Sequence, residues 1–157
     1  MVVPFFVGVL VITVLDQIAK FFTVIYLKDL GTIPIIENIF HLTYCENPGA
    51  GFGVFANHTH LLSIVTMIIV AVAMWHVTVK RPKNKLLMTG ITFLIGGAVG
   101  NLIDRIRLGY VVDFLDFCLI DFPIFNIADC FVTVGAIIFA VYIIFYSEKK
   151  EQTDGEN

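Results

Sequence analysis

The chain has 157 residues, of which 58% are hydrophobic and 15% charged, with a formal net charge of −3 and a mean hydropathy of +0.90. Soluble domains are less apolar and carry about a quarter charged residues, so the composition excludes an ordinary soluble protein. The net charge is too small to identify a partner, and no nucleic-acid partner is expected. Three cysteines without a C-x-x-C pair, and four histidines without a metal-ligand spacing, predict no disulfide framework, no metal centre and no cofactor.

Four long apolar runs account for this composition. Each is about as long as the 20 residues that span a hydrocarbon core at 1.5 Å rise per residue. They predict transmembrane helices at about 2–26, 61–79, 86–103 and 127–146. The predicted fold class is therefore all-α membrane, with a four-helix bundle in one integral membrane domain over residues 1–148. The polar residues 149–157 are expected to form a disordered tail.

The first apolar run is expected to be a retained helix and not a cleaved signal peptide. It lacks a basic segment at its start and a small-residue cleavage site. Its second half contains Asp16, Gln17 and Lys20.

Basic residues predict the orientation, because short cytoplasmic loops of membrane proteins are enriched in Lys and Arg. Four basic residues occupy the loop 80–85, and two more lie in the tail. If both are cytoplasmic, both termini lie inside, and the connections 27–60 and 104–125 face outward.

The two outward connections differ in composition. Residues 31–56 are rich in β-branched and aromatic residues and are punctuated by Pro and Gly, which predicts a small β-rich segment at the outer interface. Residues 104–125 alternate Asp with Phe, which is typical of an amphiphilic loop or helix lying in the interface.

Polar residues inside the apolar runs are costly in hydrocarbon and therefore indicate function. Asp16 and Lys20 are four residues apart and share a helix face, which is also compatible with a self-neutralising ion pair. Asn101, Asp104 and Arg105 lie on roughly one face at the outer end of the third helix. An interfacial cap with an ion pair explains this second group less well.

A third polar group opens the fourth helix. Asn126 is a good helix N-cap, but the helix dipole favours a carboxylate at Asp129 by only about 0.3–1 kcal/mol, which is less than the cost of burial in a membrane. If the third and fourth helices are antiparallel neighbours, Asp113 in the preceding connection approaches Asp129. Two close carboxyls in a low-dielectric site share one proton, and so supply a general acid and a general base that can activate water.

Five motifs, "DQIAK", "NPGAGFG", "GNLIDR", "VVDF" and "FNIAD", occur in this order along the chain. In order and spacing they resemble the motifs of lipoprotein signal peptidase (signal peptidase II). The resemblance implies an aspartic endopeptidase of the bacterial cytoplasmic membrane that removes the signal peptide from diacylglyceryl-modified prolipoproteins, cleaving just before the lipidated cysteine. It implies that Asp113 and Asp129 are the catalytic pair, near the outer face of the membrane.

The resemblance also implies supporting roles in substrate binding or in orienting the pair. These are assigned to Asp16, Asn47, Asn101, Asp104, Arg105 and Asn126, together with Lys20 beside Asp16. The β-rich segment is expected to hold the substrate, and globomycin-type cyclic peptides are expected to occupy the pair. Two positions depart from the family pattern: Gly51, where Ala is frequent, and Cys130, where Ser or Ala is usual. Cys130 is interpreted as a small packing residue.

Two other classes compete with this interpretation. Intramembrane acids also occur in proton-coupled transporters, but there they are spaced through the midplane of repeated halves, and no repeat is visible here. Intramembrane aspartyl proteases of the prepilin-peptidase or presenilin type carry G-x-G-D, whereas Leu102 and Ile103 precede Asp104. A purely structural membrane scaffold leaves Asp129 unexplained.

Overall fold

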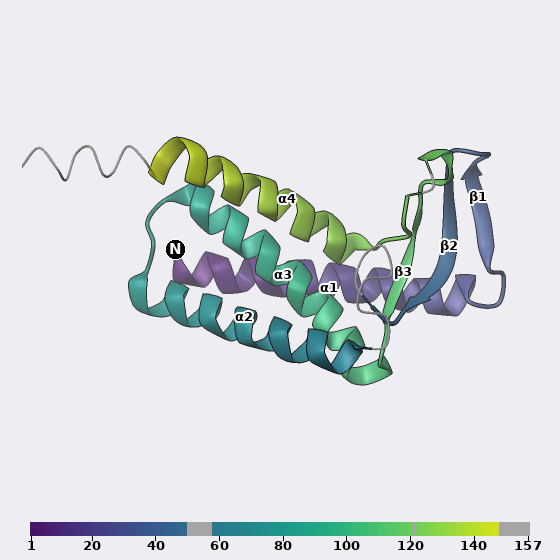
Figure 1. The fold of residues 1–157 in the computed structure, drawn as a ribbon, viewed down its shortest axis with the longest axis horizontal. Helices are drawn as coiled ribbons and strands as arrows, with labels where there is room; N and C mark the ends of the chain where they lie inside the picture. The colour runs from purple at the N-terminus through teal and green to yellow at the C-terminus, as the bar shows by residue number, and fades with distance from the viewer. Residues whose placement is uncertain (50–57, 121, 148–157) are drawn as a thin grey trace, which may run out of the picture.

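The computed structural model describes residues 1–49, 58–120 and 122–147. A bundle of long helices forms one end of the molecule and a small sheet forms the other (Figure 1). In chain order the elements are α1 (Val2–Leu27), β1 (Thr32–Ile36), β2 (Phe40–Asn47), α2 (Thr59–Lys80), α3 (Lys85–Leu108), β3 (Val111–Asp116), the 3-10 turn η2 (Cys118–Ile120), α4 (Ile127–Tyr142) and the π-helical turn η3 (Ile143–Ser147).

The four long helices are apolar on nearly all sides. Each is long and apolar enough to cross a membrane, with α4 and η3 together forming the last span, Ile127–Phe145. In α3, 44% of the most apolar stretch is buried, compared with 28% in α1, 17% in α2 and 11% in α4. Helix α3 is therefore the central helix, and the other three turn apolar side chains outward, which is expected where lipid replaces water as the solvent.

Small residues let α3 and α4 approach closely. A Cβ added to Gly135 on α4 would lie 2.7 Å from the backbone nitrogen of Leu94 and 3.0 Å from the carbonyl oxygen of Gly90, both on α3. A Cβ added to Gly97 on α3 would collide with the carbonyl oxygen of Ala128. Close backbone packing at small residues is a main source of helix association in membranes, where no hydrophobic effect acts between helices.

The sheet has three antiparallel strands in the order β1-β2-β3. Strands β1 and β2 form a hairpin, and Asn38 in its turn has a φ of 60°, which Asn tolerates better than most residues. Strand β3 arrives directly from α3, which Gly109 terminates with a φ of 82°. Cys45 then pairs with Asp113, and Asn47 with Val111. This register holds β3 against the end of the bundle at which α3 stops.

The predicted four-helix bundle and the small β-rich segment are confirmed. The prediction for 104–125 is wrong in detail, because α3 continues to Leu108 and is followed by β3 and η2 instead of an interfacial loop alone. The consecutive Val111 and Val112 favour a strand, and β2 supplies the partner that makes this strand possible. The part of the β-rich segment at 50–56 and the tail at 149–157 lie outside the described residues.

The close contact at Gly135 is a test of this packing. Gly135→Ala should lower the free energy of unfolding by about 1–3 kcal/mol, because the added methyl group meets backbone atoms that cannot rotate away. Thermal unfolding in detergent measures the change. Ala136→Val, which adds volume at the neighbouring exposed position, is the control and should leave the unfolding temperature nearly unchanged. Equal unfolding temperatures for Gly135→Ala and the unsubstituted chain would contradict this packing.

Candidate active site

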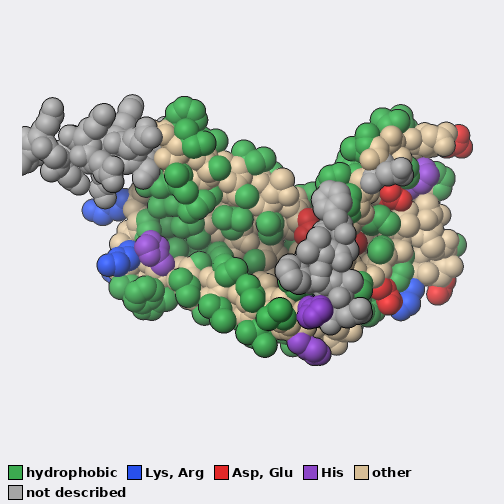
Figure 2. Space-filling view, viewed as in Figure 1, with side chains coloured by type: hydrophobic (Ala, Val, Ile, Leu, Met, Phe, Trp, Pro, Cys, Tyr) green, Lys and Arg blue, Asp and Glu red, His purple; other side chains and the backbone are tan. Residues whose placement is uncertain are grey.

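A cluster of buried polar side chains lies where the bundle meets the sheet. Residues from α1, α3, β3 and the start of α4 contribute to it, and most are almost inaccessible to solvent. The exposed fractions are 0% for Asp16 and Asn126, 2% for Asp113, 3% for Lys20 and Asp104, and 6% for Asn101. Figure 2 shows Asp and Glu side chains gathered toward the sheet end of the molecule. Most of the Lys and Arg side chains visible there lie at the opposite end, although one basic side chain also lies at the sheet end.

Asn126 is the centre of this cluster. Its side-chain oxygen accepts a hydrogen bond from the backbone nitrogen of Asp129 at 3.0 Å, and the carboxylate of Asp129 accepts one from the backbone nitrogen of Asn126 at 3.2 Å. The two residues thus form a capping box that begins α4. The Asn126 amide group also donates to Asp113 at 2.6 Å and to Asn101 at 3.0 Å. One side chain therefore links the helix start to both neighbouring elements.

Asp113 lies on strand β3, and its carboxyl group is held between two side-chain amide groups. Its Oδ1 accepts the hydrogen bond from Asn126, and its Oδ2 accepts one from Asn47 at 2.9 Å. Burial raises the pKa of Asp113 to about 6, and the negative charge of Asp129 acts in the same direction, while the two amide hydrogen bonds oppose the rise. Asp113 is thus a carboxyl that keeps its proton to an unusually high pH.

Asp129 completes a pair of interacting carboxyls. Its Oδ1 accepts a hydrogen bond from Asn101 at 2.8 Å, and its Oδ2 accepts the capping hydrogen bond. Unlike Asp113, it is only partly buried. The pair therefore consists of one enclosed carboxyl and one that solvent can reach, each oriented by Asn side chains.

A buried cation lies behind the pair. The Lys20 ammonium group contacts Asp16 at 2.8 Å, Asp104 at 2.9 Å and the side-chain oxygen of Asn101 at 2.8 Å. These contacts use the three donors of the ammonium group. Asn101 in turn donates to Asp129. Lys20 therefore positions the Asn101 amide, and that amide positions the Asp129 carboxylate.

Asp16 and Asp104 also accept hydrogen bonds from other elements. Asp16 accepts one from the backbone nitrogen of Ala128 at 2.9 Å, and Asp104 accepts one from the backbone nitrogen of Val112 at 3.2 Å. The Gln17 amide group donates to Asp104 at 2.9 Å. These bonds connect α1 and α3 to α4 and β3 at the level of the carboxyl pair.

The Arg105 side chain contacts Gly49 and not its sequence neighbour Asp104. Its guanidinium group donates to the carbonyl oxygen of Gly49 at 3.1 Å and lies close enough to Asp113 and Asp129 for their charges to act on it. An ion pair of Arg105 with Asp104, the alternative considered for this motif, is not formed; Asp104 pairs with Lys20 instead. Within the described ranges, the Arg105 Nε is buried without a hydrogen-bond partner.

All nine residues that the sequence selects for the site lie in this one region. Eight of them belong to one network of hydrogen bonds and ion pairs, which Asn47 joins from β2 through its bond to Asp113. Arg105 lies beside this network, where the charges of Asp113 and Asp129 act on it. Sequence reasoning missed Gln17 as a contributor, although a Gln next to Asp16 in an apolar run was a visible sign.

The exposed residue Cys130 follows Asp129 directly in the chain. Amide N–H groups orient oxygens of both carboxyls, which suits a proton-transferring acid pair.

Comparison with known proteins matches the chain to a peptidase family, by a family model and by curated relatives. Residues 8–145 match the family model described as Signal peptidase (SPase) II. The chain is 48% identical over 132 residues to the lipoprotein signal peptidase of Caldanaerobacter subterraneus subsp. tengcongensis, covering 83% of this chain and 89% of that protein. It is 43% identical over 135 residues to that of Clostridioides difficile, covering 86% and 90%.

Solved structures agree with the sequence comparison. A bacterial membrane enzyme determined by the in meso method at 2.3 Å resolution superposes with a TM-score of 0.83 at 28% identity, covering 94% of this chain and 91% of that one. A second such enzyme, at 1.9 Å, gives a TM-score of 0.80 at 29% identity, covering 91% and 94%.

The buried ion cluster is open to a direct test. Lys20→Met should destabilise the protein by about 3–5 kcal/mol, because it leaves two carboxylates buried without their cation. The triple variant Asp16→Asn, Lys20→Met, Asp104→Asn removes those charges and should recover much of the loss. The free energy of unfolding in detergent is the readout. A triple variant no more stable than the single one would show that charge burial is not the cause.

Proposed function

This chain belongs to the signal peptidase II family and is a multi-pass membrane peptidase, and from that premise we propose that it removes the signal peptide from diacylglyceryl-modified prolipoproteins by aspartate-activated water. Cleavage falls just before the lipidated cysteine. The observation that carries the proposal is the carboxyl pair Asp113 and Asp129, which Asn126 bridges at the junction of bundle and sheet.

The two carboxyls have different environments and therefore different roles. The enclosed Asp113, whose pKa is raised to about 6, holds the proton that the pair shares and acts as the general acid. The partly exposed Asp129 is the general base and takes a proton from a water molecule. A carboxyl oxygen has two lone-pair positions, so Asp113 can carry this proton and still accept the amides of Asn47 and Asn126.

The reaction then proceeds in two steps, attack by water and collapse of the tetrahedral intermediate. The water oxygen, losing its proton to Asp129, attacks the scissile carbonyl carbon, and Asp113 gives its proton to the carbonyl oxygen. As the C–N bond of the tetrahedral intermediate breaks, the departing nitrogen receives the proton held by Asp129, and Asp113 takes the proton of one diol hydroxyl as that group becomes the carbonyl of the new carboxyl group. The carboxyl group leaves with the signal peptide. The pair returns to one shared proton, so no Ser or Cys nucleophile takes part.

The location of the pair suits this substrate. The scissile bond lies between an apolar signal helix and a cysteine whose acyl chains are anchored in the outer leaflet, so water must reach it at the membrane surface. Strand β3 and the start of α4, which carry the pair, lie at the sheet end, opposite the basic turn between α2 and α3 (Figure 1). We therefore place the termini in the cytoplasm and the site near the outer face of the bacterial cytoplasmic membrane.

The supporting residues have distinct functions in this mechanism. Asn126 and Asn47 orient Asp113, while Asn101, fixed by Lys20 and its partners Asp16 and Asp104, orients Asp129. The sheet is the surface that holds the lipidated segment, with Arg105 beside it. Membrane lipid surrounds the bundle, and globomycin-type peptides would inhibit by occupying the carboxyl pair.

A cleavage assay in detergent tests the proposal. Purified protein is mixed with a diacylglyceryl-modified prolipoprotein, and release of the signal peptide is followed by mass spectrometry. Peptide release needs no sealed compartment, whereas transport does, so an inactive preparation in this assay would favour the transporter class. The same prolipoprotein without its diacylglyceryl group should be cleaved far more slowly.

The pair itself is tested by conservative substitution. Asp113→Asn and Asp129→Asn should each lower kcat by roughly 100-fold or more while the protein stays folded, because each removes a proton-transferring group and keeps the side-chain shape. Asp29→Asn, at an exposed position, is the matched control and should cleave normally. Asp104→Asn should mainly reduce stability. Near-normal turnover in either pair variant would refute the assignment.

The pH dependence follows from the shared proton. Below about pH 6 Asp113 keeps its proton, and above it the pair loses the proton that protonates the carbonyl oxygen. The value of kcat/KM should therefore fall as pH rises through the pKa of Asp113, by about tenfold per pH unit well beyond it. Initial rates at low substrate concentration, with folding checked at each pH, give this profile. A profile that stays level or rises across that pKa would mean that Asp113 is not the acid.

A further inference from the structure

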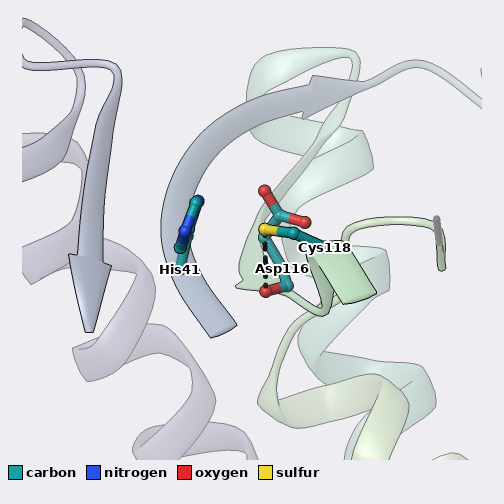
Figure 3. A group of neighbouring side chains, drawn as sticks. All are labelled: His41, Asp116 and Cys118. Carbon is teal, nitrogen blue, oxygen red and sulfur yellow. Dashed lines mark hydrogen bonds between the residues drawn. The ribbon is translucent and has the colours of Figure 1, made fainter. Parts of the chain in front are cut away.

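Three side chains of different chemistry meet on the sheet, apart from the carboxyl pair. They are His41 on β2, Asp116 at the end of β3 and Cys118 at the start of η2. One ligand atom from each, a ring nitrogen, a carboxylate oxygen and the sulfur, lies within 4.8 Å of the other two. Figure 3 shows His41 on its strand beside Asp116 and Cys118, with the Cys118 thiol donating to the Asp116 carbonyl oxygen at 3.8 Å.

Strand pairing produces this arrangement. His41 and Asp116 are directly opposite each other in the antiparallel register of β2 and β3. The 3-10 turn that follows brings Cys118 back beside Asp116. The neighbouring rings of Phe40 and Phe117, with centroids 5.1 Å apart, pack across the same strands and hold the turn in place. The three ligands are therefore positioned by backbone structure.

Two polar groups of this cluster are suited to binding a ligand. The Nε2 atom of His41 is buried and has no hydrogen-bond partner among the described residues, although buried polar atoms are normally paired. The Oδ2 atom of Asp116 accepts a hydrogen bond from the Thr43 hydroxyl at 2.7 Å, which orients the carboxylate and leaves Oδ1 available. Carboxylates that bind metal ions are commonly oriented in this way by a hydrogen bond.

We propose that His41, Asp116 and Cys118 form a binding site for a zinc-type divalent cation. Imidazole nitrogen, thiolate sulfur and one carboxylate oxygen are the ligands that Zn²⁺ prefers, whereas Mg²⁺ and Ca²⁺ require several oxygens. Tetrahedral Zn²⁺ with bonds of about 2.0–2.3 Å places its ligand atoms about 3.3–3.7 Å apart. The three ligand atoms here lie within 4.8 Å of one another, so side-chain rotation would bring them into this range. Water would complete the coordination.

The cation would brace the sheet and take no part in the peptidase chemistry. Asp116 lies three residues beyond Asp113 on β3, about 10 Å along the strand. A metal bridging β2, β3 and η2 cross-links the part of the sheet that carries one member of the carboxyl pair. The site stands independently of the proposed cleavage reaction.

Metal binding by the whole protein tests the proposal. Tag-free protein in detergent, reduced and freed of metal with a chelator, is titrated with ZnCl₂ by calorimetry, and bound zinc is counted by elemental analysis. We expect one zinc per chain and a higher unfolding temperature. His41→Ala and Cys118→Ser should each weaken the affinity by roughly tenfold or more. His60→Ala and Cys45→Ser are matched controls and should bind as the unsubstituted chain does.

A second measurement needs no variant. Zinc should protect Cys118 from a thiol-alkylating reagent, while Cys45 and Cys130 in the same molecule react at the same rate with and without metal. Replacing Zn²⁺ with Co²⁺ should give the absorption band of a thiolate-bound cobalt ion. No stoichiometric binding, unchanged affinity in both ligand variants, or alkylation of Cys118 unaffected by zinc would each overturn the proposal, and unchanged affinity would mean adventitious binding only.

Discussion

The ammonium group of Lys20 is the interaction on which the polar end of this molecule depends. A charge buried in a helix bundle is costly unless partners surround it, and here two carboxylates and an amide oxygen do so within 2.8–2.9 Å. Those partners accept further hydrogen bonds from the backbones of α4 and β3 through Ala128 and Val112. The cluster therefore fixes helices and sheet relative to one another, and apolar packing against lipid could not supply that precision.

Hydrogen bonds from Asn side chains connect the carboxyl pair to this cluster and hold it in place. Asn101 accepts a hydrogen bond from Lys20 and donates one to Asp129, so Lys20 fixes the Asp129 carboxylate through Asn101. Asn126, at the start of α4, donates a hydrogen bond to Asp113 and so fixes that carboxyl group. Asn side chains are suited to this role because each offers a donor and an acceptor without adding charge. Two carboxyls can then be held close, one enclosed and one open to water, which is the asymmetry that a general acid and a general base require.

Sequence reasoning found most of the fold and of the candidate site, for identifiable reasons. Long apolar runs predict spanning helices because a bilayer demands about 20 apolar residues, and polar residues within them stand out because hydrocarbon makes them costly. Strand β3 was missed because its two consecutive valines carry no alternation; only the partner strand β2, more than 60 residues earlier, makes them a strand. Gln17 and the cluster of His41, Asp116 and Cys118 were missed because their partners lie on other elements.

The sequence by itself determined the membrane class, the approximate spans and, through five ordered motifs, the family and the nine candidate residues. Local propensity, hydrophobic length and charge cost decide these features, and all three are properties of residues near one another in the chain. Only the tertiary structure decided that Asp104 pairs with Lys20 and not with Arg105, that Asn126 joins both carboxyls, and that Asp113 lies on a strand. The physical reason is that long-range hydrogen bonds and ion pairs depend on distances between elements, which helix packing at small residues and strand register set together.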